Sequence, residues 1–309
     1  MANVGNGDKK ITIGRFVQKV HSFPALPTVV SRIMQITASS DASLAELQKL
    51  IEADSSLAVE ILRWANSPLF GFRREVITLQ HAITLMGMRE VKNLVLAKTM
   101  FQTFQTAGEF DSFALWRHSY YAGMAARIIA KLSQGNVDVD ANECFTAGLI
   151  HDIGKLVIYL ELDEESIKKL EYNRPLNPNI IEEEESMIGI GHDHLGMQLL
   201  KKWTFPPKLQ TAVGFHHHPE NAPEEKHFSL IIHIADLISH LYEAETLQIE
   251  QAAANKTKLE KMLLRPAACE LAKKQGIPLN TTMIEIFLGN LRMEIQQETD
   301  IITLLTGSQ

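Results

Sequence analysis

The chain has 309 residues, of which 45% are hydrophobic and 22% are charged, a balance typical of a folded protein with a substantial core. Its 37 acidic and 30 basic residues give a net charge of −7, so the chain as a whole does not attract nucleic acid or an anionic membrane. Only Cys144 and Cys269 are present, and no apolar run approaches the ~20 residues that cross a bilayer, so we expect a cytoplasmic protein without disulfides.

The first hundred residues are expected to form short helices. Residues 43–46 have the Ser-x-x-Glu pattern of a capping box, and Asp54 is placed to cap the next helix. A further helix should end at Gly87, with another directly after it. Residues 78–98 therefore resemble a helix-turn-helix, but the second helix is mostly apolar, with Val91 and Leu94 among its residues, so we favour core packing over DNA binding.

Longer helices are expected after a polar interruption at residues 103–112. One begins near Leu115, and its apolar stripe contains His118. Another should run from about Ala141 to Leu160, with Asp152 on its apolar face. Beyond residue 247 the pattern predicts two amphipathic helices, at residues 251–275 and 281–305. Because no alternating strand pattern of any length occurs, we expect an all-α protein.

An acidic segment lies at residues 161–185, where nine acidic side chains account for most of the net charge. The simplest interpretation is a solvated helix-loop-helix surface. Two alternatives stay open: a face that binds a partner, and a glutamate that reaches the histidines. Glu184 and Glu185 precede His192 by about two helical turns, and either could approach the metal site and form a hydrogen bond with a metal ligand.

The histidines are concentrated, since ten of the twelve fall between His118 and His240. Burying an ionised carboxylate costs several kcal/mol unless it is paired or metal-bound, yet Asp152 and Asp236 both lie in apolar segments. Imidazole and carboxylate together are ligands for Fe, Mn, Zn, Co or Ni. Enough further imidazoles are present to bind two ions: His151, His192, His194, His216, His217 and His218.

Several motifs resemble those of HDOD proteins. The order of His118, then His151-Asp152, then Asp236 is similar to the H…HD…D signature of the HD superfamily of metal-dependent phosphohydrolases. The more specific HDOD resemblance rests on segments spread over most of the chain. These are Phe23-Pro-Ala-Leu-Pro27, Leu62-Arg-Trp-Ala-Asn-Ser67, Ala82-Ile-Thr-Leu-Met-Gly87, Arg89-Glu-Val-Lys-Asn-Leu94, Leu115-Trp-Arg-His-Ser119, Ala147-Gly-Leu-Ile-His-Asp-Ile-Gly154 and His216-His217.

The resemblance implies an N-terminal helical bundle packed on an HD-superfamily helical domain. The expected parts are the bundle at residues 1–108, an HD-like metal-binding domain at 109–245 and C-terminal helices at 246–309.

The resemblance also implies a ligand set for one or two divalent ions, with Fe or Mn favoured. His118, His151, Asp152 and Asp236 match the ligands of a first ion. His192, His216 and His217 match positions that bind a second ion in the related HD-GYP phosphodiesterases, with Asp152 bridging the two. His192 is preferred over His194 because the family pattern places the histidine four residues before a glycine, here Gly196. No Gly-Tyr-Pro motif follows His217, so hydrolysis of cyclic di-GMP is not expected.

The remaining polar residues near these motifs have two interpretations each. Lys155 is either a surface lysine near a helix end or a group that stabilises phosphate charge, and with Asp152 it is the candidate catalytic residue. His233 and His240 share a helix face with Asp236, and we interpret them as polar residues of the helix surface rather than ligands. His194 and His218 are treated as neighbours of ligands.

Three functions are compatible with these features. The first is a bacterial regulatory protein that binds protein partners in a signalling pathway and keeps a His/Asp metal site. The second is an active phosphohydrolase whose substrate is a nucleotide or another phosphoester. The third is a redox-active di-iron site. Nucleic-acid and membrane partners are not expected.

Overall fold

The computed structural model describes residues 13–38, 43–67, 70, 72, 75–105, 112–172, 180–246 and 252–306. Within these ranges the chain is helical and has no β-strand, apart from an isolated bridge between Gln134 and Val137. The all-α prediction is confirmed.

The helices of the first part are α1 (Ile13–Ser22), α2 (Thr28–Ala38), α3 (Leu44–Glu52), α4 (Ser55–Ala65), α5 (Leu79–Met86) and α6 (Met88–Gln105). The others are α7 (Ser112–Ser133), α8 (Ala141–Ile150), α9 (Gly154–Glu161), α10 (Glu164–Tyr172), α11 (Ile180–Ile188), α12 (His192–Lys202), α13 (Pro207–Gly214), the 3₁₀ turn η2 (Pro219–Asn221), α14 (Lys226–Thr246), α15 (Ala252–Leu263), α16 (Pro266–Gln275) and α17 (Thr281–Thr306).

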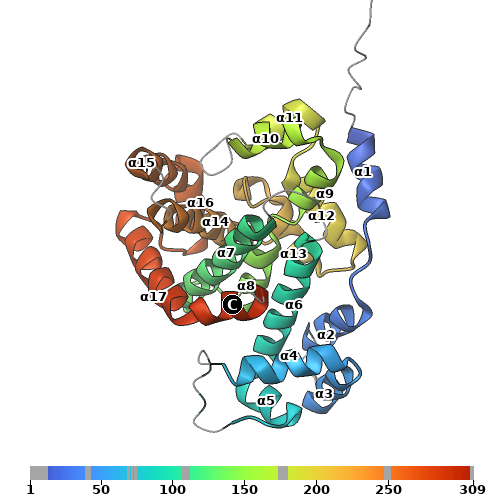
Figure 1. Cartoon of the computed structure of the whole chain (residues 1–309). Helices are drawn as coiled ribbons and strands as arrows, with labels where there is room; N and C mark the ends of the chain where they lie inside the picture. The colour runs from blue at the N-terminus through green and yellow to red at the C-terminus, as the bar shows by residue number, and fades with distance from the viewer. Residues whose placement is uncertain are drawn as a thin grey trace, which may run out of the picture.

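Helices α2 to α5 form a small group that contacts the rest of the chain through α6 (Figure 1). The predicted cap of α4 is confirmed, because the Asp54 carboxylate accepts a hydrogen bond from the Leu57 N–H at 3.0 Å. The predicted capping box is wrong, since Ser43 stands at the N-cap of α3 but its side chain makes no cap hydrogen bond. Gly87 ends α5 at a φ of +86°, as predicted, and Val91 and Leu94 of α6 lie in the core.

The centre of the molecule is built on α7, which packs against α8, α14, α6 and α17 (Figure 1). Its apolar face is buried as expected except at Leu132 near the end of the helix, and His118 lies on it with 4% of its surface exposed. Residues 228–239 of helix α14 are all buried, so the polar residues among them face other helices rather than water. This surrounds the histidine-rich segments with protein.

Two predicted helices are each broken into two. The helix expected at 141–160 stops at Ile150, turns through residues 151–153 and resumes as α9 at Gly154. The helix expected at 251–275 stops at Leu263, and α16 begins at Pro266. Proline lacks an N–H and is accepted at the first position of a helix but not in its middle, which explains the second break. Both breaks place polar side chains beside the histidines.

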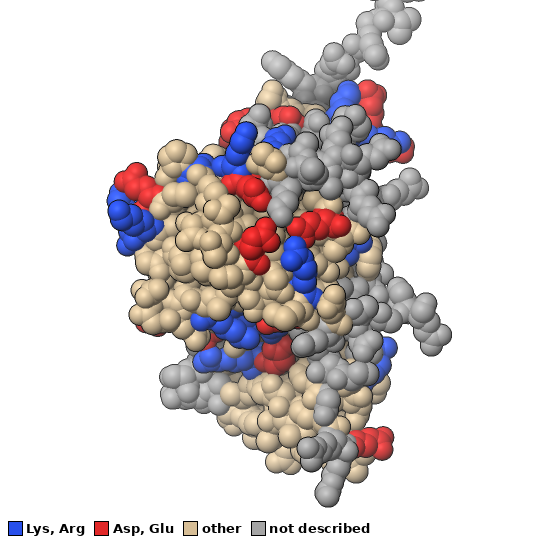
Figure 2. Space-filling model, turned by 90° about the vertical axis from the view of Figure 1, so that its left-hand side faces the viewer, with Lys and Arg blue, Asp and Glu red and all other residues tan. Residues whose placement is uncertain are grey.

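The acidic segment forms α10 and α11, and residues 173–179 between them lie outside the described residues. The predicted domain boundary at residue 108 also falls outside the described residues, and the predicted boundary at residue 245 falls in the last turn of α14. On the face in Figure 2, basic and acidic side chains lie beside one another in small groups, and neither sign forms a continuous patch. Among the described helices, none combines the length and the apolar character that crossing a membrane requires.

Candidate metal centre

The break after α8 places His151 and Asp152 at the centre of the histidine cluster. The ring of His151 folds back so that its Nδ1–H donates to the carbonyl of Gly148 at 2.7 Å. The next helix begins at Gly154, where α12 passes very close. A Cβ at this position would lie 1.9 Å from the His192 carbonyl oxygen, so the approach requires glycine. His151 and Asp152 are both fully buried. The turn therefore fixes the position of two side chains at once.

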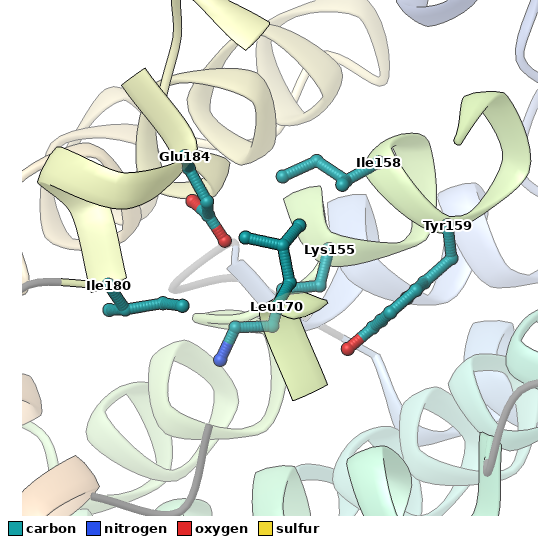
Figure 3. Close-up of a pocket in the computed structure, with 6 residues that line it drawn as sticks. All are labelled: Lys155, Ile158, Tyr159, Leu170, Ile180 and Glu184. Atoms are coloured by element: carbon teal, nitrogen blue, oxygen red, sulfur yellow. The ribbon is translucent and has the colours of Figure 1, made fainter. Parts of the chain in front are cut away.

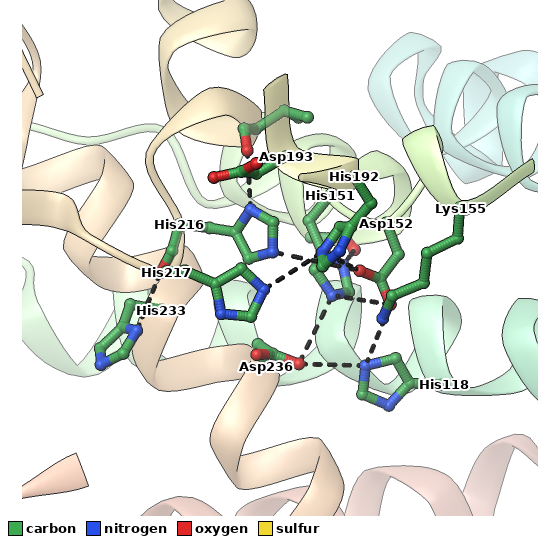
Figure 4. Close-up of polar contacts among 12 residues, drawn as sticks. His118, His151, Asp152, Lys155, His192, Asp193, His216, His217, His233 and Asp236 are labelled. Carbon is green, nitrogen blue, oxygen red and sulfur yellow. Dashed lines mark hydrogen bonds and ion pairs between the residues drawn. The ribbon is translucent and has the colours of Figure 1, made fainter. Parts of the chain in front are cut away.

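One group of four donor atoms comes from α7, the α8–α9 turn and α14 (Figure 4). The Nε2 atom of His118 lies 3.1 Å from Asp236 Oδ1 and 3.7 Å from Asp152 Oδ2. The Nε2 atom of His151 lies 3.5 Å from each of the same two oxygens. Donors that each lie ~2.1 Å from one ion at ~90–110° are ~3.0–3.4 Å apart. The spacing of this group suits a single metal ion.

A second group faces the other oxygen of the same carboxylate. His192 Nε2 lies 3.1 Å from Asp152 Oδ1 and 3.1 Å from His217 Nε2, and His216 Nε2 lies 4.0 Å from Asp152 Oδ1. The three imidazoles are close enough to share one ion. Asp152 thus stands between the two groups, with Oδ2 toward the first and Oδ1 toward the second (Figure 4).

The second ring nitrogen of His118, His151, His192 and His216 is engaged elsewhere. His216 Nδ1–H donates to the Val213 carbonyl at 2.7 Å, and His192 Nδ1 contacts the Glu184 carboxylate at 2.8 Å. His118 Nδ1 contacts Glu243 at 3.1 Å. Such contacts orient a metal-binding imidazole and leave the lone pair of Nε2 free.

Two of these Nε2 atoms are buried without a hydrogen-bond partner, and this bears on whether the residues fit a metal ion. His151 and His216 each donate Nδ1–H to a carbonyl, and carbonyls only accept, so Nε2 is the nitrogen of each ring that remains to bind an ion. Neither Nε2 atom has a hydrogen-bond partner, and both residues are fully buried. An unpartnered buried acceptor is costly, and a cation is the partner these atoms fit. The residues present therefore fit a bound metal.

Ionisation within the cluster agrees with this reading. Burial raises the pKa of Asp152, but nearby His151, Lys155 and His192 outweigh that effect and hold it well below its usual range. Burial and the neighbouring His151 and His192 lower the pKa of His216 to about 3, so this ring is neutral. For His118 burial lowers the pKa, but contacts with Asp236 and Glu243 raise it to about 9. The site thus holds an ionised carboxylate between the two groups and a neutral ring at His216, whereas nearby carboxylates stabilise the protonated form of His118.

Lys155 connects the cluster to a pocket. Its Nζ lies 2.5 Å from Asp152 Oδ2, and only 7% of the residue is exposed, so the interpretation as a surface lysine is wrong. A narrow pocket opens beside it (Figure 3). Its lining is Lys155, Ile158, Tyr159, Leu170, Ile180 and Glu184. Its polar groups are the Lys155 ammonium, the Glu184 carboxylate and the Tyr159 hydroxyl.

The structure also decides between the alternatives that the sequence left open for Glu184, Glu185, His194 and His218. Glu184 reaches the cluster and is 2% exposed, whereas Glu185 faces solvent. His194 pairs with its neighbour Asp193 at 3.0 Å, and the His194 side chain is 44% exposed, away from the donor groups. His218 is similarly exposed.

The interpretation of His233 and His240 as residues of the helix surface is wrong, whereas the expectation that neither is a metal ligand stays a prediction. His233 is 4% exposed, and its Nδ1–H donates to the His216 carbonyl at 2.8 Å. The ring of His240 stacks on that of His118 with 4.1 Å between the centroids, and its Nε2 lies 3.4 Å from Asp236 Oδ1. The nearly continuous apolar character of residues 230–238 was the signal that this helix is buried and that its histidines face other residues.

Comparisons with known proteins agree with this fold. The model of the HDOD domain family matches residues 23–219. A protein of Treponema pallidum (strain Nichols), described only as uncharacterized, is 26% identical over 209 residues, which is 67% of this chain and 40% of that relative. The chain thus matches less than half the length of this relative.

Solved structures resemble the chain over nearly its whole length. A Geobacter sulfurreducens HDOD domain protein of unknown function is 19% identical, with a TM-score of 0.72 over 94% of this chain and 99% of that one. A provisionally named phosphohydrolase of Shewanella amazonensis SB2B is 20% identical, with a TM-score of 0.69 over 94% and 98%. A provisionally named signal transduction protein of Marinobacter aquaeolei VT8 is 17% identical, with a TM-score of 0.73 over 95% and 65%. At these identities the likeness concerns the fold alone.

Proposed function

Because the chain belongs to the HDOD family, whose model covers residues 23–219, we propose that it is a metal-dependent phosphohydrolase with a dinuclear centre. The observation that carries the proposal is the placement of Asp152, whose two carboxylate oxygens face two separate groups of histidines. A purely structural ion needs one such group, not two sharing a carboxylate.

Each residue has a defined role in this proposal. His118, His151 and Asp236 would hold one ion together with Asp152, and His192, His216 and His217 would hold the other, also with Asp152. The mixed imidazole and carboxylate donors suit Fe or Mn. When bound there, two such ions would supply an activated water for attack on phosphorus and would neutralise phosphate charge.

Lys155 is proposed to contact the phosphate. Its ammonium lies beside Asp152 and lines the pocket, so it can interact with an anion that enters there. The pocket is narrow and far smaller than the ~300–1,000 Å³ of sites for drug-sized ligands. We therefore propose a small phosphoester, or the terminal phosphate of a larger one, as the substrate.

The test begins with metal content, measured by elemental analysis on protein purified without a histidine tag under low oxygen. We expect about two Fe or Mn ions per chain and loss of both in Asp152→Asn, because both groups need this carboxylate. Asp163→Asn, at an exposed position, is the matched control. Fewer than about a tenth of an ion per chain would contradict a metal centre.

Activity is then tested with p-nitrophenyl phosphate and bis(p-nitrophenyl) phosphate. Lys155→Met should keep both ions and lower kcat by ~10²-fold, the order expected for one lost charge-stabilising contact. Lys168→Met, whose lysine is exposed, should change neither quantity. Unchanged turnover in Lys155→Met would remove this lysine from the reaction.

A second function, a regulatory protein that binds protein partners, is favoured by a different observation. His151, Asp152, His192 and His216 are fully buried, and the pocket beside Lys155 is narrow. In that case the ions stabilise the fold and the surface binds the partner. Two bound ions with no turnover of either phosphoester would support the regulator and overturn the hydrolase.

A further inference from the structure

The turn between α15 and α16 reaches the second group of metal donors, although it lies beyond the residues that the HDOD family model matches. Both helices pack on α14, and Leu259, Leu263 and Ala268 around the turn are fully buried. Arg265 stands at the N-cap of α16, directly before Pro266. The turn is thus held firmly in place with one arginine directed toward η2.

The guanidinium of Arg265 makes three hydrogen bonds. Two nitrogens donate to the two carboxylate oxygens of Glu220, each at 2.9 Å, which is the paired geometry that arginine forms with carboxylates. One of these nitrogens also donates to the backbone carbonyl of His217 at 3.0 Å. The arginine therefore fixes a proposed metal ligand through its main chain.

The preceding carbonyl is fixed in the same way. His233 Nδ1–H donates to the His216 carbonyl at 2.8 Å, so two successive peptide groups are held from α14 and from the α15–α16 turn. The rings of His216 and His217 have centroids 4.1 Å apart, and both belong to the second donor group. Fixing both peptides fixes the direction in which the two rings point.

We propose that Arg265, aligned by Glu220, is a positioning residue for the second metal ion, so that the C-terminal helices complete this half of the centre. The inference rests on the dinuclear centre proposed above. A contribution to stability alone does not account for the arrangement, since the side chains of Arg265 and Glu220 are 26% and 29% exposed and such pairs contribute only ~0–1 kcal/mol.

Arg265→Lys is the decisive variant, because lysine keeps the charge but cannot donate to Glu220 and the carbonyl in one plane. The control is Arg292→Lys, which alters another arginine of the C-terminal helices that pairs with α14, through Glu245 at 2.5 Å, without contacting a ligand. Ions per chain are followed by elemental analysis during titration with a chelator. We expect Arg265→Lys to lose the second ion at ~10–100-fold lower chelator concentration while keeping the first, and Arg292→Lys to match the wild type.

Two results would overturn the inference. One is an Arg265→Lys protein that keeps both ions with the wild-type chelator profile. The other comes from amide hydrogen exchange of residues 215–222 in ion-free protein, where Arg265→Lys should exchange faster than Arg292→Lys, and equal rates would exclude a positioning role. Wild-type protein with fewer than two ions would instead refute the dinuclear function, and the exchange comparison would still decide whether Arg265 holds the loop.

Discussion

Glu184 accepts two hydrogen bonds from His192, one from the backbone N–H at 2.7 Å and one from the ring Nδ1 at 2.8 Å. These contacts fix both the start of α12 and the orientation of the ring. Burial lowers the pKa of His192, but Glu184 and Asp152 raise it to about 9. Glu184, a buried carboxylate in a segment whose other acidic residues lie mostly at the surface, thus determines how the His192 ring faces Asp152.

We predict that Glu184→Ala weakens binding of the second ion by ~10–100-fold, because His192 loses the partner that orients it. The matched control is Glu185→Ala, which removes the adjacent, exposed carboxylate and should leave metal affinity unchanged. Chelator competition followed by elemental analysis measures both. Equal affinities in the two variants would show that His192 needs no support from Glu184.

At the scale of elements, the contact between α9 and α12 holds the two donor groups together. α9 follows the turn that carries Asp152, and α12 begins at His192. The two backbones meet at Gly154, where a Cβ would also lie 2.6 Å from the Gly196 nitrogen. Only glycine allows this approach without moving one helix.

We predict that Gly154→Ala lowers the free energy of unfolding by ~3 kcal/mol, because the new methyl group forces the two helices apart. The matched control is Gly289→Ala in α17, where the structure has open space around the position. That change should be neutral or stabilise the protein by up to ~1 kcal/mol, since alanine is the better helix former. Urea unfolding at neutral pH distinguishes the two. A neutral Gly154→Ala would mean that α9 and α12 can separate freely.

At the scale of the whole molecule, α1 lies against the helices that carry the site rather than beside α2 to α5 (Figure 1). Glu161 at the end of α9 accepts from Arg15 at 2.6 Å and pairs with Lys19 at 3.0 Å. Lys202 at the end of α12 donates to the carbonyls of Val20 and His21, at 3.1 and 2.7 Å. The first described helix is therefore fastened to both α9 and α12.

We predict that Glu161→Gln lowers the free energy of unfolding at pH 7 by ~0.5–1 kcal/mol, the range of partly exposed ion pairs. Burial raises the pKa of Glu161, but hydrogen bonds from Lys19 and Arg15 outweigh it and lower the pKa below its unfolded value. The stabilisation is therefore present above pH ~4.5 and is lost as the pH falls below that value.

The difference between wild type and Glu161→Gln in urea unfolding should accordingly stay constant between pH 7 and pH ~5 and shrink as the pH falls below ~4.5. Glu165→Gln is the control, because the Glu165 side chain is 82% exposed and its pair with Lys169 lies within one helix. A difference that does not change with pH would show that the Glu161 carboxylate contributes through packing rather than charge.

Local information in the sequence determined the helical class, the cap at Asp54, the end of α5 at Gly87 and the burial of the His118 stripe. Helical periodicity and capping depend on residues within a few positions of one another, and these are readable without the fold. The residues that form the donor groups were identified from the order of His118, His151-Asp152 and Asp236 and from the family resemblance, and the structure brings them together.

Only the tertiary structure decided where the helices break and what supports the donors. Nothing near Ile150 in sequence shows that α12 passes within contact of Gly154, and nothing near Arg265 shows that the His217 carbonyl lies beside it. The same holds for Glu184, which differs from Glu185 only in the direction it faces once α11 packs on α12. Which carbonyl or carboxylate meets a given ring depends on contacts between residues far apart in the chain, whereas the type of each donor is a property of its own side chain.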